Sequence, residues 1–168
     1  MASCTGKIAC RPIALGLVAL IFSLILLGRA QAGGGHFYPP VADALVREEC
    51  GSCHLAYPAA MLPKRSWTRM IGELTKHFGD DASVDAATAE RITRYLTANA
   101  ADGDGQRYGA KLMRGVAMDN APLRITELPK WVSAHRKISA AEWKRQKVGS
   151  KANCVACHAD AARGYFEE

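Results

Sequence analysis

The sequence is short, has few aromatic residues and has no segment of alternating apolar and polar residues, and each of these shortages limits the class of protein. Aromatic residues make up 7% of the 168 residues, so two half-size domains would each have a thin core, which small domains commonly reinforce with a disulfide, metal or cofactor. No segment alternates apolar and polar residues, so we expect few β-strands. The length excludes a large multidomain enzyme, a multispan transporter and a long coiled coil.

The first 32 residues contain no acidic side chain and have the order of a secretory signal. Lys7 and Arg11 precede an apolar run of about 15 residues, shorter than the roughly 20 that a membrane-spanning helix needs. Ala30-Gln31-Ala32 then supplies a small-x-small cleavage site. We predict a cleaved signal peptide over residues 1–32, with cleavage after Ala32. A retained membrane anchor is the alternative.

Removal of this segment lowers the formal net charge from +6 to +3 and leaves an uneven distribution of charge. Residues 33–102 carry 7 basic and 9 acidic side chains, and residues 103–168 carry 12 and 7. A basic second half favours an acidic partner or a membrane surface. We expect no nucleic-acid partner, because an exported protein seldom meets nucleic acid.

The four cysteines of the mature chain form two Cys-x-x-Cys-His motifs. Residues 50–54 read Cys-Gly-Ser-Cys-His and residues 154–158 read Cys-Val-Ala-Cys-His. This is the attachment signal for c-type haem. The two thiols, about one helical turn apart, form thioethers with the vinyl groups on one porphyrin edge, and the adjacent imidazole reaches the iron. The motifs predict two covalent haem c groups, bound through Cys50, Cys53, Cys154 and Cys157.

Redox disulfides and a shared zinc ion are the alternative interpretations of the cysteine pairs. Redox Cys-x-x-Cys motifs follow a strand, and no strand pattern precedes either motif here. Cysteine pairs that share one zinc usually lie about 15–20 residues apart, whereas these lie about 100 apart. Neither alternative requires a histidine directly after each pair.

The motifs provide His54 and His158 as proximal ligands, so function depends on the sixth ligand of each iron. An iron with two protein ligands transfers electrons, whereas an open position binds or activates small molecules. His77 lies 23 residues after His54, and His135 lies 23 residues before His158. We assign His77 to the first haem and His135 to the second, and a crossed assignment is the alternative. His36 follows three glycines and is predicted to be unligated.

Methionine is the competing ligand type. Met61 is only seven residues past the first motif, too close to loop over the porphyrin. Met70 shares a helical face with apolar residues and is interpreted as core. Met113 and Met118 are the stronger competitors, because either lies within reach of the second iron.

Helical periodicity and capping residues predict an all-α protein of two small haem-binding domains, residues 33–102 and 103–168, the first cytochrome c-like and the second less regular. Asp102–Gly105 marks the boundary. The predicted helices cover residues 41–53, 67–78 with His77 near its end, 85–101, 110–118 and 129–135, then one from a capping box at 139 and one carrying the second motif. Ser66 is predicted to cap the second helix and Gly79 to end it.

The first half resembles a class I cytochrome c. A helix runs into the Cys50–His54 motif, and a closing helix contains Tyr95-Leu96. The departure from that class is the lack of a well-placed methionine, with His77 available instead.

The mature chain as a whole resembles the dihaem cytochrome c family of bacterial periplasms. The segments that carry this resemblance are Glu49–His54, Leu62-Pro63 with Ser66-Trp67, His77–Ser83, Tyr95–Asp102, Pro122–Pro129 and Asn153–His158. The resemblance implies two bis-histidine haems, one in each half, and a periplasmic location. It also implies electron delivery to a small oxygen-binding monohaem cytochrome c, often with a membrane b-type cytochrome upstream.

The sequence therefore predicts an electron-transfer protein that is not an enzyme and has no small-molecule substrate. Two alternatives remain, a dihaem peroxidase-like enzyme and a gas or redox sensor. Both need an iron with an open or releasable site, and the known dihaem peroxidases are much larger than this chain. The spin state of the two irons distinguishes these functions.

Overall fold

A computed structural model describes residues 36–167, so the predicted signal over residues 1–32 lies outside the described residues. Within residues 36–167 there is no β-strand, only two isolated bridges, Phe37 with Tyr165 and His77 with Asp80. None of the helices in this part is both long and apolar enough to cross a membrane. The prediction of a mainly helical protein is therefore confirmed for the described residues.

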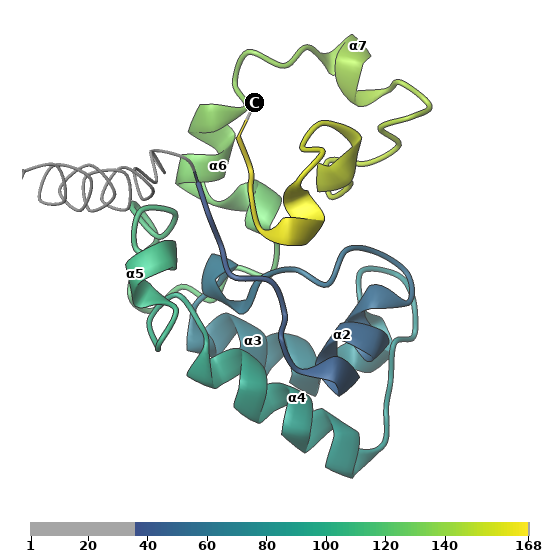
Figure 1. Ribbon diagram of the computed structural model, residues 1–168, viewed down its shortest axis with the longest axis vertical. Helices are drawn as coiled ribbons and strands as arrows, with labels where there is room; N and C mark the ends of the chain where they lie inside the picture. Colours follow the sequence, from purple (N-terminus) through teal and green to yellow (C-terminus); the bar gives the residue numbers. More distant parts are fainter. Residues whose placement is uncertain (1–35, 168) are drawn as a thin grey trace, which may run out of the picture. The chain divides into compact units, whose positions relative to one another are not determined.

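The described part of the first half has three α-helices, of which the first and the second each pack against the third (Figure 1). They are α2 (Ala44–Gly51), α3 (Lys64–Gly72) and α4 (Ala86–Ala98). Asp43 and Asp85 cap α2 and α4, and each carboxylate accepts hydrogen bonds from two backbone N–H groups of the first turn. Arg91 of α4 also pairs with Asp43 at 3.0 Å, so one carboxylate both caps α2 and joins it to α4.

Helix α3 differs from its predicted range at both ends. It begins at Lys64, whose backbone N–H donates to the Asp102 carboxylate at 2.7 Å, so the partner of the first turn comes from the loop after α4. The prediction that Ser66 caps this helix is wrong, because Ser66 lies inside it and is fully buried. The helix ends at Gly72, and a short 3₁₀ helix, η3 (Leu74–Lys76), follows.

His77 therefore lies in a turn rather than in a helix. The chain leaves η3 at His77, and Phe78 then adopts a φ of 56°, followed by Gly79 at 115°. Left-handed backbone cannot continue a right-handed helix. The backbone N–H of Asp80 donates to the His77 carbonyl at 3.1 Å and closes the turn.

The loop after the first motif contains a 3₁₀ helix, η2 (Ala59–Met61), that is fixed by contacts to both neighbouring helices. The buried Trp67 indole donates to the Ala59 carbonyl at 2.8 Å. The Ala101 backbone N–H, just past α4, donates to the Leu62 carbonyl at 2.9 Å. The loop is thus a rigid part of the core.

The second half consists of short elements. In chain order they are α5 (Gln106–Gly109), η4 (Ile125–Glu127), α6 (Pro129–Ala134), α7 (Ala140–Trp143), η5 (Cys154–Ala156) and η6 (Ala161–Arg163). Helix α6 matches its predicted range, and the Ser139 hydroxyl caps α7 as expected by accepting from the Glu142 N–H.

Two predictions for this half are wrong. Residues 110–118 form turns instead of a helix, and Gly115, with a φ of 85°, lies among them. The second motif lies on the 3₁₀ helix η5 rather than on an α-helix, because the Ala156 and Cys157 N–H groups donate to the carbonyls three residues before them, each at 3.2 Å, and Cys157 is the C-cap of η5.

One hydrophobic core contains side chains from both predicted halves, including Leu62, Trp67 and Ile92 from the first and Leu112 and Leu128 from the second. The predicted boundary at 102–105 falls in the turn between α4 and α5, and the division into two domains stays a prediction.

Candidate functional site

The first motif lies at the end of α2. Cys50 is in the last turn of the helix, Ser52 is its C-cap, and Cys53 and His54 follow immediately. The turn after η3 brings His77 back to this point, so the two imidazoles face each other with ring centroids 6.1 Å apart and planes inclined by 19°. The structure thus brings His77 next to the first motif, so the four predicted residues of the first site lie close together in space.

The second motif meets His135 in the same way. His135 is the C-cap of α6, and its ring centroid lies 6.1 Å from that of His158, with the planes inclined by 82°. The two pairs therefore have the same separation but different relative orientations, nearly parallel in the first and nearly perpendicular in the second.

This separation fits an iron held between two imidazoles. An imidazole nitrogen binds a first-row metal ion at about 2.0–2.1 Å, so two imidazoles on opposite sides of one ion have ring centres about 6–7 Å apart. Both pairs meet this condition without rearrangement. The rings that lie near each other are His54 with His77 and His135 with His158, the contacts expected for the uncrossed assignment, and the ligation itself stays a prediction.

A cavity of about 340 Å³ lies at the second site, within the usual size range of small-molecule and cofactor pockets, about 300–1,000 Å³. Its lining includes all four predicted residues of this site, Cys154, Cys157, His135 and His158. Most of the remaining lining is apolar and aromatic, with Met61, Leu112, Ile125, Trp131, Trp143 and Phe166. The cavity fits a flat apolar ring system tethered through the cysteines.

Backbone carbonyls fix the orientation of three of the four imidazoles. The Nδ1 atom of His54 lies 2.8 Å from the Leu55 carbonyl, that of His135 lies 2.9 Å from the Trp131 carbonyl, and that of His158 lies 3.2 Å from the Glu167 carbonyl. A carbonyl oxygen only accepts, so Nδ1 carries the proton in each case. The Nε2 atom is then left without a proton and can bind a metal ion.

Aromatic contacts hold the second pair further. The Trp131 ring stacks on His135 at 4.0 Å and 16°, and Trp143 lies 5.8 Å from Trp131 and 6.1 Å from His135. In the first pair, the Phe78 ring contacts the His77 ring with centroids 4.8 Å apart. The Arg124 guanidinium lies over the Phe78 ring, 4.0 Å from its centroid.

Burial determines the protonation tendencies at both sites. It is the main cause that lowers the pKa of His77, with a smaller contribution from His54, while Asp80 opposes the shift. A lowered pKa favours the neutral imidazole, which is the form that binds iron. Burial also raises the pKa of the Cys50 and Cys154 thiols, and it raises the pKa of Tyr57 to about 12.

The structure places the two methionines that compete as ligands of the second iron outside the cavity of the second site. Met113 packs against the core and Met118 is 87% exposed, and neither lines the cavity of the second site. The two cysteine pairs do not meet, since within residues 36–167 no three His, Cys, Asp or Glu side chains gather as ligands for a bare metal ion. The four cysteines of this part form no disulfide.

Three residues at these sites were not identified as site residues from the sequence. Met61 and His36 line the second cavity, although both come from the first half of the chain. Tyr57 stacks on His54 and bonds to the segment before the second motif. The cavity contacts of Met61 and His36 and the hydrogen bond of Tyr57 join segments far apart in sequence, so no local pattern signals them.

Comparison with known proteins shows what this chain is similar to. Residues 46–166 match the family model described as dihaem cytochrome c. A dihaem cytochrome c from Rhodobacter sphaeroides is 45% identical, with a TM-score of 0.69 over 76% of this chain and 99% of that chain. A second structure of the protein purified from that organism gives 44% identity and a TM-score of 0.62, with the same coverage.

A dihaem cytochrome c from Shewanella baltica is 35% identical, with a TM-score of 0.60 over 74% of this chain and 86% of that chain. No curated protein gives a significant match. Together with the two Cys-x-x-Cys-His motifs, these similarities identify the groups at the two sites as covalently attached haem c.

Proposed function

Because the chain belongs to the dihaem cytochrome c family, we propose that it transfers single electrons between redox proteins through two bis-histidine haems. The chain spans nearly the whole length of the Rhodobacter sphaeroides relative, and members of this family are typically electron carriers rather than enzymes. The observation that carries the proposal is the pairing of imidazoles at 6.1 Å beside each motif, His54 with His77 and His135 with His158.

Each haem supplies an iron that cycles between ferric and ferrous states. The chain's own residues determine how that iron is held. Cys50, Cys53, Cys154 and Cys157 tether the ring, and the Nδ1 hydrogen bonds described above keep His54, His135 and His158 in one tautomer and one orientation. Ligands fixed in this way need little movement when the charge on the iron changes, which favours rapid electron transfer.

Two saturated irons leave no position for a substrate, and this distinguishes the proposal from a peroxidase or a gas sensor. The test is optical and EPR spectroscopy of the holoprotein in both oxidation states, with and without CO. We expect wholly low-spin haem that does not respond to CO. A high-spin fraction, CO binding or peroxide turnover would contradict bis-histidine ligation and favour a sensor or an enzyme.

Single variants assign the ligands. We expect that His77→Ala and His135→Ala each convert one haem, and only one, to a high-spin or water-ligated form that binds CO. Met118→Ala is the control, because this exposed methionine does not line the second cavity, and its spectrum should match that of the unmodified protein. An unchanged spectrum in either histidine variant would remove that ligand assignment.

The N-terminal signal supports a periplasmic location. Haem attachment to Cys-x-x-Cys-His motifs suggests export as well. Cell fractionation together with intact-mass measurement tests this, and the expected product begins at Gly33 and carries two haems. Unprocessed protein in the membrane fraction would favour the retained anchor.

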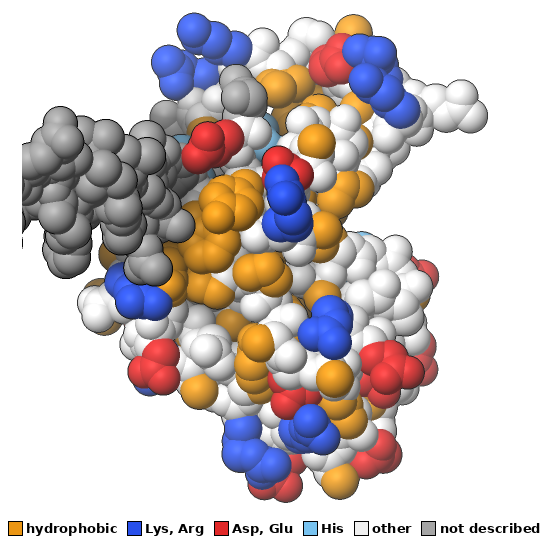
Figure 2. Space-filling view, viewed as in Figure 1, with side chains coloured by type: hydrophobic (Ala, Val, Ile, Leu, Met, Phe, Trp, Pro, Cys, Tyr) orange, Lys and Arg blue, Asp and Glu red, His pale blue; other side chains and the backbone are white. Residues whose placement is uncertain are grey.

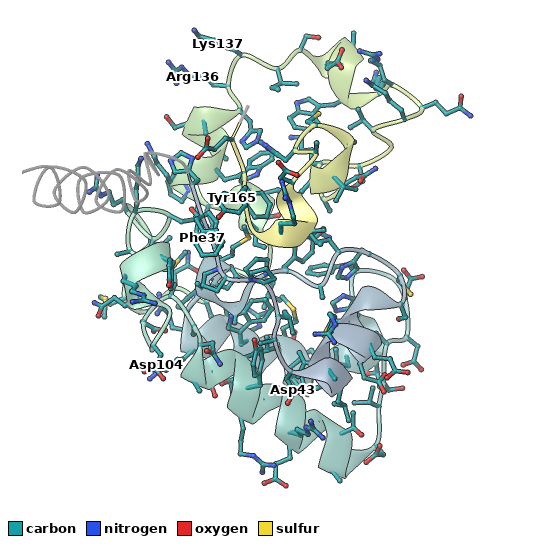
Figure 3. All side chains as sticks on the ribbon, viewed as in Figure 1. Phe37, Asp43, Asp104, Arg136, Lys137 and Tyr165 are labelled. Atoms are coloured by element: carbon teal, nitrogen blue, oxygen red, sulfur yellow. The ribbon has the colours of Figure 1, made fainter. Side chains whose placement is uncertain are left out.

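Docking of redox partners is proposed to use the basic second half. Figure 2 shows Lys and Arg side chains around α6, α7 and the loop between them, where Arg136 and Lys137 lie (Figure 3). An acidic partner would be steered to such a surface, and the rate would fall as salt screens the charges. A small oxygen-binding monohaem cytochrome c and a membrane b-type cytochrome are the partners proposed from the family. Partner reduction rates that do not change with salt would contradict this docking mode.

A further inference from the structure

Tyr57 contacts the proximal ligand of the first site and the segment that precedes the second motif. It follows His54 by three residues, and its ring stacks on the His54 imidazole with centroids 5.0 Å apart and planes inclined by 23°. Tyr57 is partly buried and packs against the hydrophobic core. Its ring is therefore in fixed contact with the proximal ligand of the first site.

The hydroxyl of the same residue reaches the second site. It donates a hydrogen bond to the Ala152 carbonyl at 2.6 Å, across 95 residues of sequence. Ala152 precedes Cys154 by two residues, and the Cys154 sulfur lies 3.5 Å from that same carbonyl oxygen. The hydrogen bond thus ends on the segment that attaches the second haem.

This bridge has no parallel elsewhere between the two motif regions. In the described part of the chain, no other side-chain hydrogen bond joins residues 50–62 to residues 150–167. The neighbouring connections between distant segments involve the backbones of residues 36–38 and 164–166.

We propose that Tyr57 couples the two haem sites, and that electron exchange between them runs through His54, the Tyr57 ring and hydroxyl, and the Ala152–Cys154 segment. This inference rests on the electron-transfer function proposed above. One electron leaves the reduced haem and arrives at the oxidised haem. No bond forms or breaks, and the Tyr57 hydroxyl keeps its proton and is not itself oxidised.

Tyr57→Phe tests the bridge, because it removes only the hydroxyl and keeps the ring that stacks on His54. The control is Tyr165→Phe, which also removes one phenolic hydroxyl. Tyr165 is 46% exposed, its ring packs on Phe37 at 4.9 Å, and it does not line the cavity of the second site (Figure 3). Both variants are studied as holoproteins that carry two haems.

The measurement is exchange NMR on half-reduced holoprotein, in which haem methyl signals of the two singly reduced forms exchange at a rate that does not depend on protein concentration. Losing one neutral hydrogen bond lowers the population of the bridged arrangement by about two- to tenfold. We expect exchange in Tyr57→Phe to slow by about that factor and exchange in Tyr165→Phe to stay at the unmodified rate. The haem methyl shifts and both reduction potentials should stay unchanged in Tyr57→Phe.

Three results would overturn the proposal. They are exchange at the unmodified rate in Tyr57→Phe, slowing that is accompanied by altered methyl shifts or potentials, and equal slowing in Tyr165→Phe. The second result would mean that Tyr57 acts only by supporting the haem surroundings.

Tyr57→Leu supplies a second test if Tyr57→Phe does not take up both haems. It removes the ring as well as the hydroxyl, so electron exchange should slow by at least as much as expected for Tyr57→Phe, and exchange at the unmodified rate would overturn the proposal. Failure of the proposed function is separately visible, because it would show as high-spin or CO-binding haem in the unmodified protein whatever the exchange rate.

Discussion

Replacing Ser66 with alanine is expected to stabilise the protein, although the loss of a serine that caps the start of a helix usually lowers stability. Ser66 is 0% exposed, and its hydroxyl has no hydrogen-bond partner among the described protein groups. It lies inside α3, next to the buried Trp67. At the start of the helix, the Asp102 carboxylate instead accepts a hydrogen bond from the Lys64 backbone N–H.

The size of the effect follows from that environment. A buried hydroxyl without a partner costs about 1–3 kcal/mol, and alanine is favoured over serine inside a helix by a few tenths of a kcal/mol. Removing one oxygen atom also loses packing contacts, each worth about 0.1–0.2 kcal/mol. The expected net gain is about 1 kcal/mol, equivalent to a Tm increase of about 3–6 °C for a domain of this size.

Thermal unfolding of the ferric holoprotein, followed by far-UV circular dichroism, measures this difference. Asp85→Ala is the control for a true cap, because the Asp85 carboxylate accepts from the Ala87 and Thr88 N–H groups at 3.0 Å, and its loss should lower stability by about 0.5–2 kcal/mol. If Ser66→Ala instead lowers the Tm as much as Asp85→Ala does, the hydroxyl has a partner and the reasoning fails.

Three further predictions concern the ligands, the acid stability and the packing. The imidazole planes of the two pairs are inclined by 19° and 82°, so we expect two ferric EPR signals. The signal from the nearly parallel pair should be rhombic and the signal from the nearly perpendicular pair strongly axial, and two identical signals would contradict these orientations. The backbone N–H of Val46 and then Arg91 hold the pKa of Asp43 below its usual range. A depressed folded pKa stabilises the protein above the unfolded value of about 3.9, and this stability is lost as the pH falls through the folded pKa. At pH values below about 4 the Tm should therefore decrease as the pH is lowered, and it should decrease less steeply in Asp43→Asn. Equal slopes of Tm against pH in the two proteins would refute this contribution. Gly109→Ala should lower the denaturant midpoint by the equivalent of about 1–3 kcal/mol, because a Cβ atom there would overlap the Ala60 carbonyl and Ala101, and an unchanged midpoint would show that the backbone can move aside.

Features encoded within a few residues were predictable from the sequence. Both haem attachment motifs are contiguous, and the predicted cap Ser139 lies three residues from the N–H group that it serves. Helix α4 follows directly from its apolar periodicity and from Asp85.

Features that depend on distant partners were not predictable. Helix α3 begins early because Asp102, 38 residues further on, accepts from its first N–H group. Residues 110–118 form turns where a helix was expected, and the buried Leu112 among them packs into the core shared by both halves, which local periodicity does not reveal. The contact of Tyr57 with Ala152 depends on the packing of the two motif regions, which no local pattern reveals.

The pairing of residues 36–38 with residues 164–166 has a consequence for biosynthesis. The Tyr38 N–H donates to the Gly164 carbonyl at 2.8 Å, and the Phe166 N–H donates to the His36 carbonyl at 3.1 Å. His36, Tyr38 and Phe166 all line the pocket beside the second motif. The walls of that pocket therefore cannot be completed until residue 166 has been synthesised, whereas both imidazoles of the first pair, His54 and His77, are translated well before it. Assembly of the two centres should be sequential, with the amino-terminal one able to mature first and the other one closing only after residue 166 is available.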